Sequence, residues 1–287
     1  MIILSEQTKR QIDNFIQEPT HGLLITGSEG TGKLFVAKYL ASKILGLNEA
    51  NIENYPYFLQ MQIVPGKNVI SIDQIRELKK FLKLKTQGRK RIRRVLILKD
   101  AHAMLKAAQN AILKALEEPP VDTVIILTAT GSNRLIDTIN SRVHEIPLTG
   151  PSKANLMKAF SSKASKEALQ SAYLMSGGRV GLFSSLIQNE DHELPKFISL
   201  AKRILSMPKY YRLIEIDKII SQELELDVLL QAFSIITVTG MRISANKHDE
   251  RQVRNWHSKL VHINDTRSKL RFNPNSKLLL TNLFLSI

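Results

Sequence analysis

Three short apolar segments stand out in the first half of the chain, at residues 22–26, 95–98 and 124–128. Each consists mostly of leucine, isoleucine and valine, which is typical of a parallel strand covered on both faces. Helical patterns lie between them, and this alternation indicates a parallel α/β sheet. Beyond Pro147 one helical pattern follows another. The sequence therefore predicts an α/β fold whose last part is all helical.

The helices between the strands have recognisable ends. Ser71 and Gln74 have the spacing of a capping box, and apolar residues then repeat on one helical face. Another helix, around residues 104–118, is rich in alanine and ends at two prolines, which cannot supply the next backbone donors. The chain of 287 residues exceeds what one core usually serves. Boundaries are predicted at the Gly-Pro pair near residue 150 and, more weakly, at Leu194-Pro195.

Composition excludes several classes of protein. The chain has no cysteine, so it has no disulfide, no thiolate zinc or iron–sulfur site and no cysteine nucleophile. Its start lacks the basic and long apolar regions of a secretion signal. No apolar run approaches the roughly 18 residues of a membrane span. We therefore expect a cytoplasmic protein with no membrane partner.

The net charge is unusual: 41 Lys and Arg against 26 Asp and Glu give +15. Such an excess favours a polyanion as partner, although a solvated basic surface is the plainer alternative. The densest cluster holds nine basic residues within residues 79–94. The single Trp256 also lies among basic residues, where it could meet DNA or serve as a partly buried anchor.

A glycine-rich loop carries the first chemical motif. Residues 27–34 read Gly-Ser-Glu-Gly-Thr-Gly-Lys-Leu, directly after the first predicted strand and before a helix. This is the P-loop arrangement, in which backbone N–H groups and a helix N-terminus surround an anion and the lysine reaches terminal phosphates. The alternative is a glycine-rich turn beside a surface lysine. The candidate phosphate-binding residues are Gly27, Gly30, Thr31, Gly32 and Lys33.

Two positions depart from an ATP-hydrolysing site. The motif should end in Ser or Thr, whose hydroxyl binds Mg²⁺, but Leu34 stands there. The strand at 95–98 is followed by Lys99 and Asp100, where a pair of carboxylates is normal. In either register of that motif one carboxylate is missing. His102 nearby is interpreted as a helix-start residue, and no metal ligand set is predicted.

The chain resembles bacterial DNA polymerase III clamp-loader subunits of the AAA+ class. The resemblance rests on the motifs at residues 71–78, 108–120, 138–142 and 273–278 and covers essentially the whole chain. It implies a P-loop AAA+ domain with a parallel sheet (1–150), a small helical lid domain (151–194) and an all-α collar domain (195–287).

Within that family, the loss of the hydroxyl at Leu34 and of one carboxylate favours the delta-prime type over the ATP-hydrolysing gamma/tau type. The resemblance then implies a hetero-oligomer with gamma/tau and delta subunits, a sliding clamp and primer–template DNA as partners, and membership of the DNA polymerase III holoenzyme. No intrinsic ATPase and no required cofactor are expected, whereas binding of ATP or ADP without hydrolysis stays open. The family's four-cysteine zinc module is missing, so no zinc is expected. A gamma/tau-like ATPase and a stand-alone DNA-binding protein with a relic P-loop remain the alternatives.

The resemblance also assigns a catalytic role in trans to Arg142. In the family, an arginine after this Ser141 position enters the nucleotide site of the neighbouring subunit, where a permanently charged guanidinium stabilises the γ-phosphate. The alternative is an ion pair within the chain, for instance with Glu145. Thr130 lies near the family's sensor position. Gly181 occupies the place of an arginine of the ATPase subunits, so Arg179 is not predicted to sense nucleotide.

Overall fold

The computed structural model describes residues 3–64, 69–188, 193–222, 224–270 and 274–287. Asn273, the first residue of the C-terminal motif named above, lies outside these residues. The chain divides into two compact units. Unit 1 comprises Met1–Leu156 with Arg179–Gly181, and unit 2 comprises Met157–Gly178 with Leu182–Ile287. This division does not separate a lid from a collar, so the domain boundaries at 150 and 194 stay a prediction.

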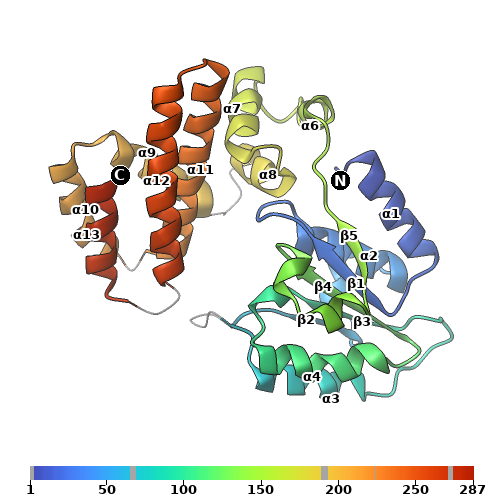
Figure 1. The fold of residues 1–287 in the computed structure, drawn as a ribbon. Helices are drawn as coiled ribbons and strands as arrows, with labels where there is room; N and C mark the ends of the chain where they lie inside the picture. Colours follow the sequence, from blue (N-terminus) through green and yellow to red (C-terminus); the bar gives the residue numbers. More distant parts are fainter. Residues whose placement is uncertain (1–2, 65–68, 189–192, 223, 271–273) are drawn as a thin grey trace. The chain divides into compact units, whose positions relative to one another are not determined.

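Unit 1 is built on a five-stranded parallel sheet in the order β2-β3-β4-β1-β5 (Figure 1). The strands are β1 (Gly22–Thr26), β2 (Phe58–Met61), β3 (Arg94–Leu98), β4 (Thr123–Ala129) and β5 (His144–Pro147). The three predicted strands are thus confirmed as β1, β3 and β4. The expected fold class, a parallel α/β sheet followed by helices, is confirmed as well.

Helices cover both faces of this sheet (Figure 1). The helices of unit 1 are α1 (Glu6–Gln17), α2 (Lys33–Leu45), α3 (Ile72–Leu82), α4 (Lys106–Glu117), the short α5 (Asp137–Asn140) and the start of α6 (Lys153–Ala159). Alternate residues of a strand point to opposite faces. Leu24 therefore joins the cluster under α3 and α4, while Leu23 and Ile25 join the cluster under α1 and α2. All five residues of β1 are buried for this reason.

The helix ends follow the sequence signals. The capping box at Ser71 is present in both directions, with Gln74 as its partner. Helix α4 ends at Glu117, before the two prolines, and α2 ends at a left-handed Gly46. The capping side chain fixes where α3 begins, and its apolar residues then face the sheet.

Strands β2 and β5 were not predicted from the sequence. Each has four residues, and each lies at an edge of the sheet where part of its surface is exposed. In β5 only Ile146 is buried. An edge strand needs no long apolar run, so the signal that marks β1, β3 and β4 is missing there.

Unit 2 is all helical in its described residues. Its core joins apolar residues of α8 to α13, among them Phe233 and Phe284, whose rings meet edge to face at 5.9 Å. Trp256 is half-buried against Gly240 and is therefore a packing anchor. The helices are α7 (Lys166–Ser176), α8 (Val180–Gln188), α9 (Glu193–Ser206), α10 (Lys209–Ser221), α11 (Leu226–Asn246), α12 (Glu250–Leu270) and α13 (Ser276–Ser286).

Helix α11 is long and apolar enough to cross a membrane by length and composition alone, so the expectation that no apolar run approaches that length is wrong. This is weak evidence, because the core helix of a soluble protein passes the same test. Leu229, Leu230 and Phe233 of this helix are fully buried in the core of unit 2. The buried share of the apolar window as a whole is 33%.

A polar cluster joins the start of β4 to the loop before β3. The Asp122 carboxylate accepts hydrogen bonds from Thr86 and from Arg93, whose Nη2 lies 3.3 Å from Oδ2. Burial raises the pKa of this carboxyl, but hydrogen bonds, first from Thr86, and the charge of Arg94 outweigh burial, and the pKa lies below its ordinary value. The cluster therefore holds the loop through a carboxylate that is ionised at neutral pH.

We predict that Asp122→Asn lowers the free energy of unfolding at pH 7 by about 1–3 kcal/mol, because it removes a charged partner from half-buried donors. A carboxyl with a lowered pKa stabilises the fold above the ordinary value of about 4, and this contribution is lost as pH falls through the folded-state pKa. Urea unfolding should therefore show the two proteins converging below about pH 4. Asp73→Asn, in an exposed pair with Arg76, is the control; an equal loss there at pH 7 would contradict the account.

Candidate functional site

The glycine-rich loop lies between β1 and α2, at the carboxyl edge of the sheet. Gly30 and Gly32 have φ of 82° and 88°, a backbone conformation that favours glycine. Gly32 is also the N-cap residue of α2, so the first amides of that helix open toward the loop. Strand, loop and helix thus form the predicted P-loop.

Lys33 turns back onto this loop. Its Nζ donates to the carbonyl oxygens of Gly27 at 2.8 Å and Ser28 at 3.1 Å, and the residue is only 8% exposed. Burial lowers the pKa of the Lys33 ammonium; the charges of Asp100 and Glu29 oppose this, and Lys99 adds to it. The structure therefore brings the P-loop lysine and the Lys99-Asp100 pair together, as the motif order predicts.

The metal-binding hydroxyl of an ATPase has no counterpart among the described residues of this loop. Leu34 packs against the core cluster under α1 and α2. The Thr31 hydroxyl, the nearest alternative, donates to the Ser28 carbonyl oxygen at 2.8 Å. Among the described residues, no group of three or more His, Asp or Glu side chains could hold a metal ion. Leu34 thus offers no oxygen at the position where an ATPase has its Mg²⁺-binding hydroxyl.

The segment after β3 places one carboxylate, that of Asp100, near the glycine-rich loop. Asp100 has a left-handed backbone with φ of 54°, and its N–H donates to the Thr128 hydroxyl at 2.9 Å. His102 lies in the 3₁₀ turn Ala101–Ala103, in agreement with its interpretation as a helix-start residue. Thr130, just after β4, has a buried hydroxyl with no hydrogen-bond partner among the described residues. Because it follows a parallel strand, it lies at the same edge of the sheet as the glycine-rich loop.

Residues 179–181 belong to unit 1 and lie against the loop. The Arg179 Nη1 donates to the Glu29 carbonyl oxygen at 3.2 Å. A Cβ placed on Gly181 would come within 2.9 Å of the Gly30 carbonyl oxygen and 3.3 Å of the Gly32 amide nitrogen. Only glycine allows this close approach, so the residue that replaces the family's arginine here packs on the P-loop backbone.

Arg142 lies at the other edge of the sheet. It follows α5 and precedes β5, and its guanidinium pairs with Glu117 of α4 at 2.8 Å. It also donates to the Thr138 carbonyl oxygen at 2.8 Å. The suggested partner Glu145 is wrong; that carboxylate accepts from Thr26 instead. Glu117 was missed, although it is the exposed last residue of a helix that the two prolines were expected to end.

Strand β5 keeps Arg142 away from the chain's own P-loop. His144 pairs with Leu23 at the start of β1, whereas Gly27 follows the end of β1. The four steps along the strand from Leu23 to Gly27 span roughly 13 Å at about 3.3 Å per residue. The structure therefore brings together the phosphate-loop residues but not Arg142, whose side chain is one-third exposed at the opposite edge.

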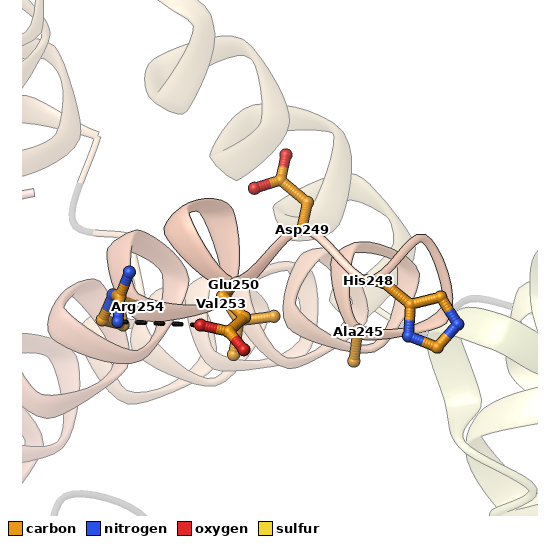
Figure 2. Close-up of a pocket in the computed structure, with 6 residues that line it drawn as sticks. All are labelled: Ala245, His248, Asp249, Glu250, Val253 and Arg254. Carbon is orange, nitrogen blue, oxygen red and sulfur yellow. Dashed lines mark ion pairs between the residues drawn. The ribbon is translucent and has the colours of Figure 1, made fainter.

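A surface hollow of about 400 Å³ lies at the turn between α11 and α12 in unit 2 (Figure 2). Asp249, Glu250 and His248 line it, and Glu250 pairs loosely with Arg254 at 3.9 Å. None of the predicted site residues contributes to it. The hollow is therefore separate from the candidate site.

Known proteins resemble the chain as follows. The family model described as "DNA polymerase III, delta subunit" matches residues 4–152. DNA polymerase III subunit delta' of Pseudomonas aeruginosa is 32% identical over 55% of this chain and 53% of the relative, and that of Escherichia coli is 31% identical over 48% and 41%. The match thus spans about half the length of these curated relatives. A gamma subunit-related protein of DNA polymerase III from Thermotoga maritima shares the fold, with a TM-score of 0.58, 22% identity and 98% coverage of both chains.

The contact of Gly181 with the loop generates a prediction. Gly181→Ala places a Cβ against two backbone groups that cannot move aside cheaply, so the segment at 179–181 must shift away. We expect faster amide hydrogen exchange at Gly30–Lys33 in this variant than in the wild type. Ser184→Ala, farther along α8, is the control and should leave those amides unchanged; equal exchange in both variants would mean that the contact does not hold the loop.

Proposed function

The chain belongs to the DNA polymerase III delta' subunit family, and we propose that it acts as a delta'-type clamp-loader subunit with a silent ATP site and an arginine finger, Arg142. Membership rests on the family match over more than half of the chain. In this proposal the chain forms a hetero-oligomer with gamma/tau and delta subunits in the cytoplasm. The complex would place a sliding clamp on primer–template DNA.

The position of Arg142 is the observation that carries the proposal. The guanidinium lies at the edge of the sheet opposite the chain's own P-loop, so any phosphate that it contacts belongs to another molecule. Its only ion pair among the described residues is a partly exposed one with Glu117, and such pairs contribute about 0–1 kcal/mol. A neighbouring γ-phosphate can replace Glu117 at little cost, because a planar guanidinium binds phosphate oxygens bidentately.

The chain's own loop supports a silent site. Gly27, Gly30, Thr31, Gly32 and Lys33 keep the shape of a phosphate loop, yet Leu34 offers no oxygen to Mg²⁺. We therefore propose no intrinsic ATP hydrolysis, no required cofactor and no zinc. ATP or ADP bound without hydrolysis is compatible with the backbone donors that remain.

We predict that Arg142→Ala slows ATP hydrolysis by the neighbouring subunit roughly 10³-fold or more, as is typical of arginine fingers. Turnover should be measured with cognate gamma/tau and delta subunits, clamp and primed DNA, with this chain absent, present or substituted. Glu117→Gln removes the same ion pair but keeps the guanidinium, so it should retain stimulation.

Size-exclusion chromatography should show that both variants assemble. An assembled Arg142→Ala complex with an unchanged rate removes the finger role. ATP hydrolysis by the chain alone favours a gamma/tau-like ATPase, and failure to join the complex favours a stand-alone DNA-binding protein.

The variant Lys33→Ala tests whether the chain's own P-loop takes part in ATP hydrolysis. The change removes an ammonium that contacts the Gly27 and Ser28 carbonyl oxygens, so some loss of local stability is expected. Clamp loading by the assembled complex should nevertheless change less than about twofold, because this site performs no hydrolysis. A large loss of loading by a folded, assembled variant would contradict the proposal.

A further inference from the structure

Figure 1 shows the loop between α3 and β3. Positive charge is concentrated in this loop and at its two ends. Nine lysines and arginines fall within residues 79–94, and no aspartate or glutamate occurs between Glu77 and Asp100. The proposed finger and P-loop use none of these residues. The function proposed above includes DNA as a partner but assigns no residues to its binding.

Three of the basic side chains hold the loop in place. The buried Arg94 donates to the carbonyl oxygens of Leu82 and Leu84 at the end of α3. Arg93 reaches Asp122, and it also donates to the Gly88 carbonyl oxygen at 3.1 Å. Lys90 Nζ donates to the Leu45 carbonyl oxygen at the end of α2 at 2.6 Å. The loop is thus a built surface with its backbone tied to the unit at three places.

Other members of the cluster point to solvent. These exposed residues, which we call the basic loop surface, are Lys80, Lys83, Lys85, Arg89 and Arg91. Within the part of the chain that the structure describes, none of them takes part in an ion pair. Their charges are therefore available to a partner.

The position of the surface excludes nucleotide bound at the P-loop as that partner. The loop precedes β3 and the P-loop follows β1, so the two lie at opposite edges of the parallel sheet. Strand β4 lies between β3 and β1, and the length of a strand separates the two edges. Any anion on the basic loop surface is a different one.

We propose that the basic loop surface binds the sugar–phosphate backbone of nucleic acid without reading its sequence. Protein–protein interfaces are depleted in lysine, whereas nucleic-acid interfaces are strongly positive, and three of these five cations are lysines. The only aromatic ring of residues 79–94, Phe81, has the Arg94 guanidinium over one face and packs against the core cluster, so no free aromatic platform for stacking a base stands beside these cations. Contacts from flexible cations alone fix position on a backbone and carry no sequence information.

This inference deepens the proposed function and rests on it for the identity of the nucleic acid, primer–template DNA. It assigns that DNA a place on the side of unit 1 away from the P-loop. The salt dependence of binding provides a direct measure, because each phosphate neutralised on duplex DNA adds about 0.9 to the slope of log affinity against log salt.

The test compares the full chain with the variant Lys83→Gln/Lys85→Gln/Arg89→Gln. The probe is a fluorescein-labelled duplex of about 30 base pairs with a recessed 3′ end, and its anisotropy is followed from about 50 to 200 mM KCl, the range over which phosphate contacts are screened. The control, Lys158→Gln/Lys166→Gln/Lys202→Gln, removes the same charge from exposed residues elsewhere. All six side chains are exposed, so each protein should fold as the wild type does, which circular dichroism checks.

The variant lacks three cations, so we expect the slope of its log affinity against log salt to be smaller in magnitude by about 2.7 than that of the wild type. Between about 50 and 200 mM KCl, the affinity of the wild type should therefore fall about 40-fold more than the affinity of the variant. The control should retain the wild-type slope. Equal slopes for loop variant and control would overturn the inference. A competition experiment gives a second way to overturn it. If poly-L-glutamate displaces the labelled duplex from the wild type as effectively as unlabelled DNA does, the surface recognises acidic protein equally well.

The two proposals can fail separately. A chain that joins gamma/tau and delta subunits but binds DNA independently of the loop leaves the proposed function standing and removes this inference. A chain that binds the duplex through the loop but never joins those subunits keeps the inference about nucleic acid and removes the clamp-loader role.

Discussion

The parallel direction of the five strands is the constraint on which the rest of unit 1 depends. It places every loop that follows a strand at one edge of the sheet and every loop that precedes a strand at the other. The P-loop follows β1, whereas Arg142 precedes β5 and the basic loop surface precedes β3. A chain folded in this way cannot bring Arg142 to its own phosphate loop. The topology is therefore compatible with the proposed action of Arg142 on a neighbouring subunit.

The positive charge of the chain has two separate physical uses. Arg93 and Arg94 donate to Asp122 and to the last carbonyl groups of α3, where a cation also complements the helix dipole. These contacts bury or half-bury the guanidinium groups and fix the loop. Lys83 and Lys85 remain hydrated, because holding the backbone does not require them. The number of basic residues does not tell which of them fix the loop and which offer their charge to solvent. Their hydrogen-bond partners in the structure do.

The sequence predicted those features of the fold and of the site that a local pattern of residues specifies. Continuous apolar runs identified β1, β3 and β4, and the Ser71 capping box fixed the start of α3. The edge strands β2 and β5 were missed because they are short and partly exposed. The order of motifs placed Lys33 near Asp100. The partner of Arg142 was misjudged because Glu145 is close in sequence, whereas Glu117 comes close only when α4 packs near the start of β5, and no local pattern records that.

The residues of the P-loop each have a role in the fold itself. A Cβ on Gly32 would meet no other atom within 4 Å, so only its φ of 88° requires glycine there. Lys33 satisfies the Gly27 and Ser28 carbonyl oxygens, and Leu34 adds apolar contact to the core. Retention of the glycines and the lysine is therefore no evidence of hydrolysis. An ATPase has its metal-binding hydroxyl at the position after the lysine, and in this chain Leu34 packs against the core there.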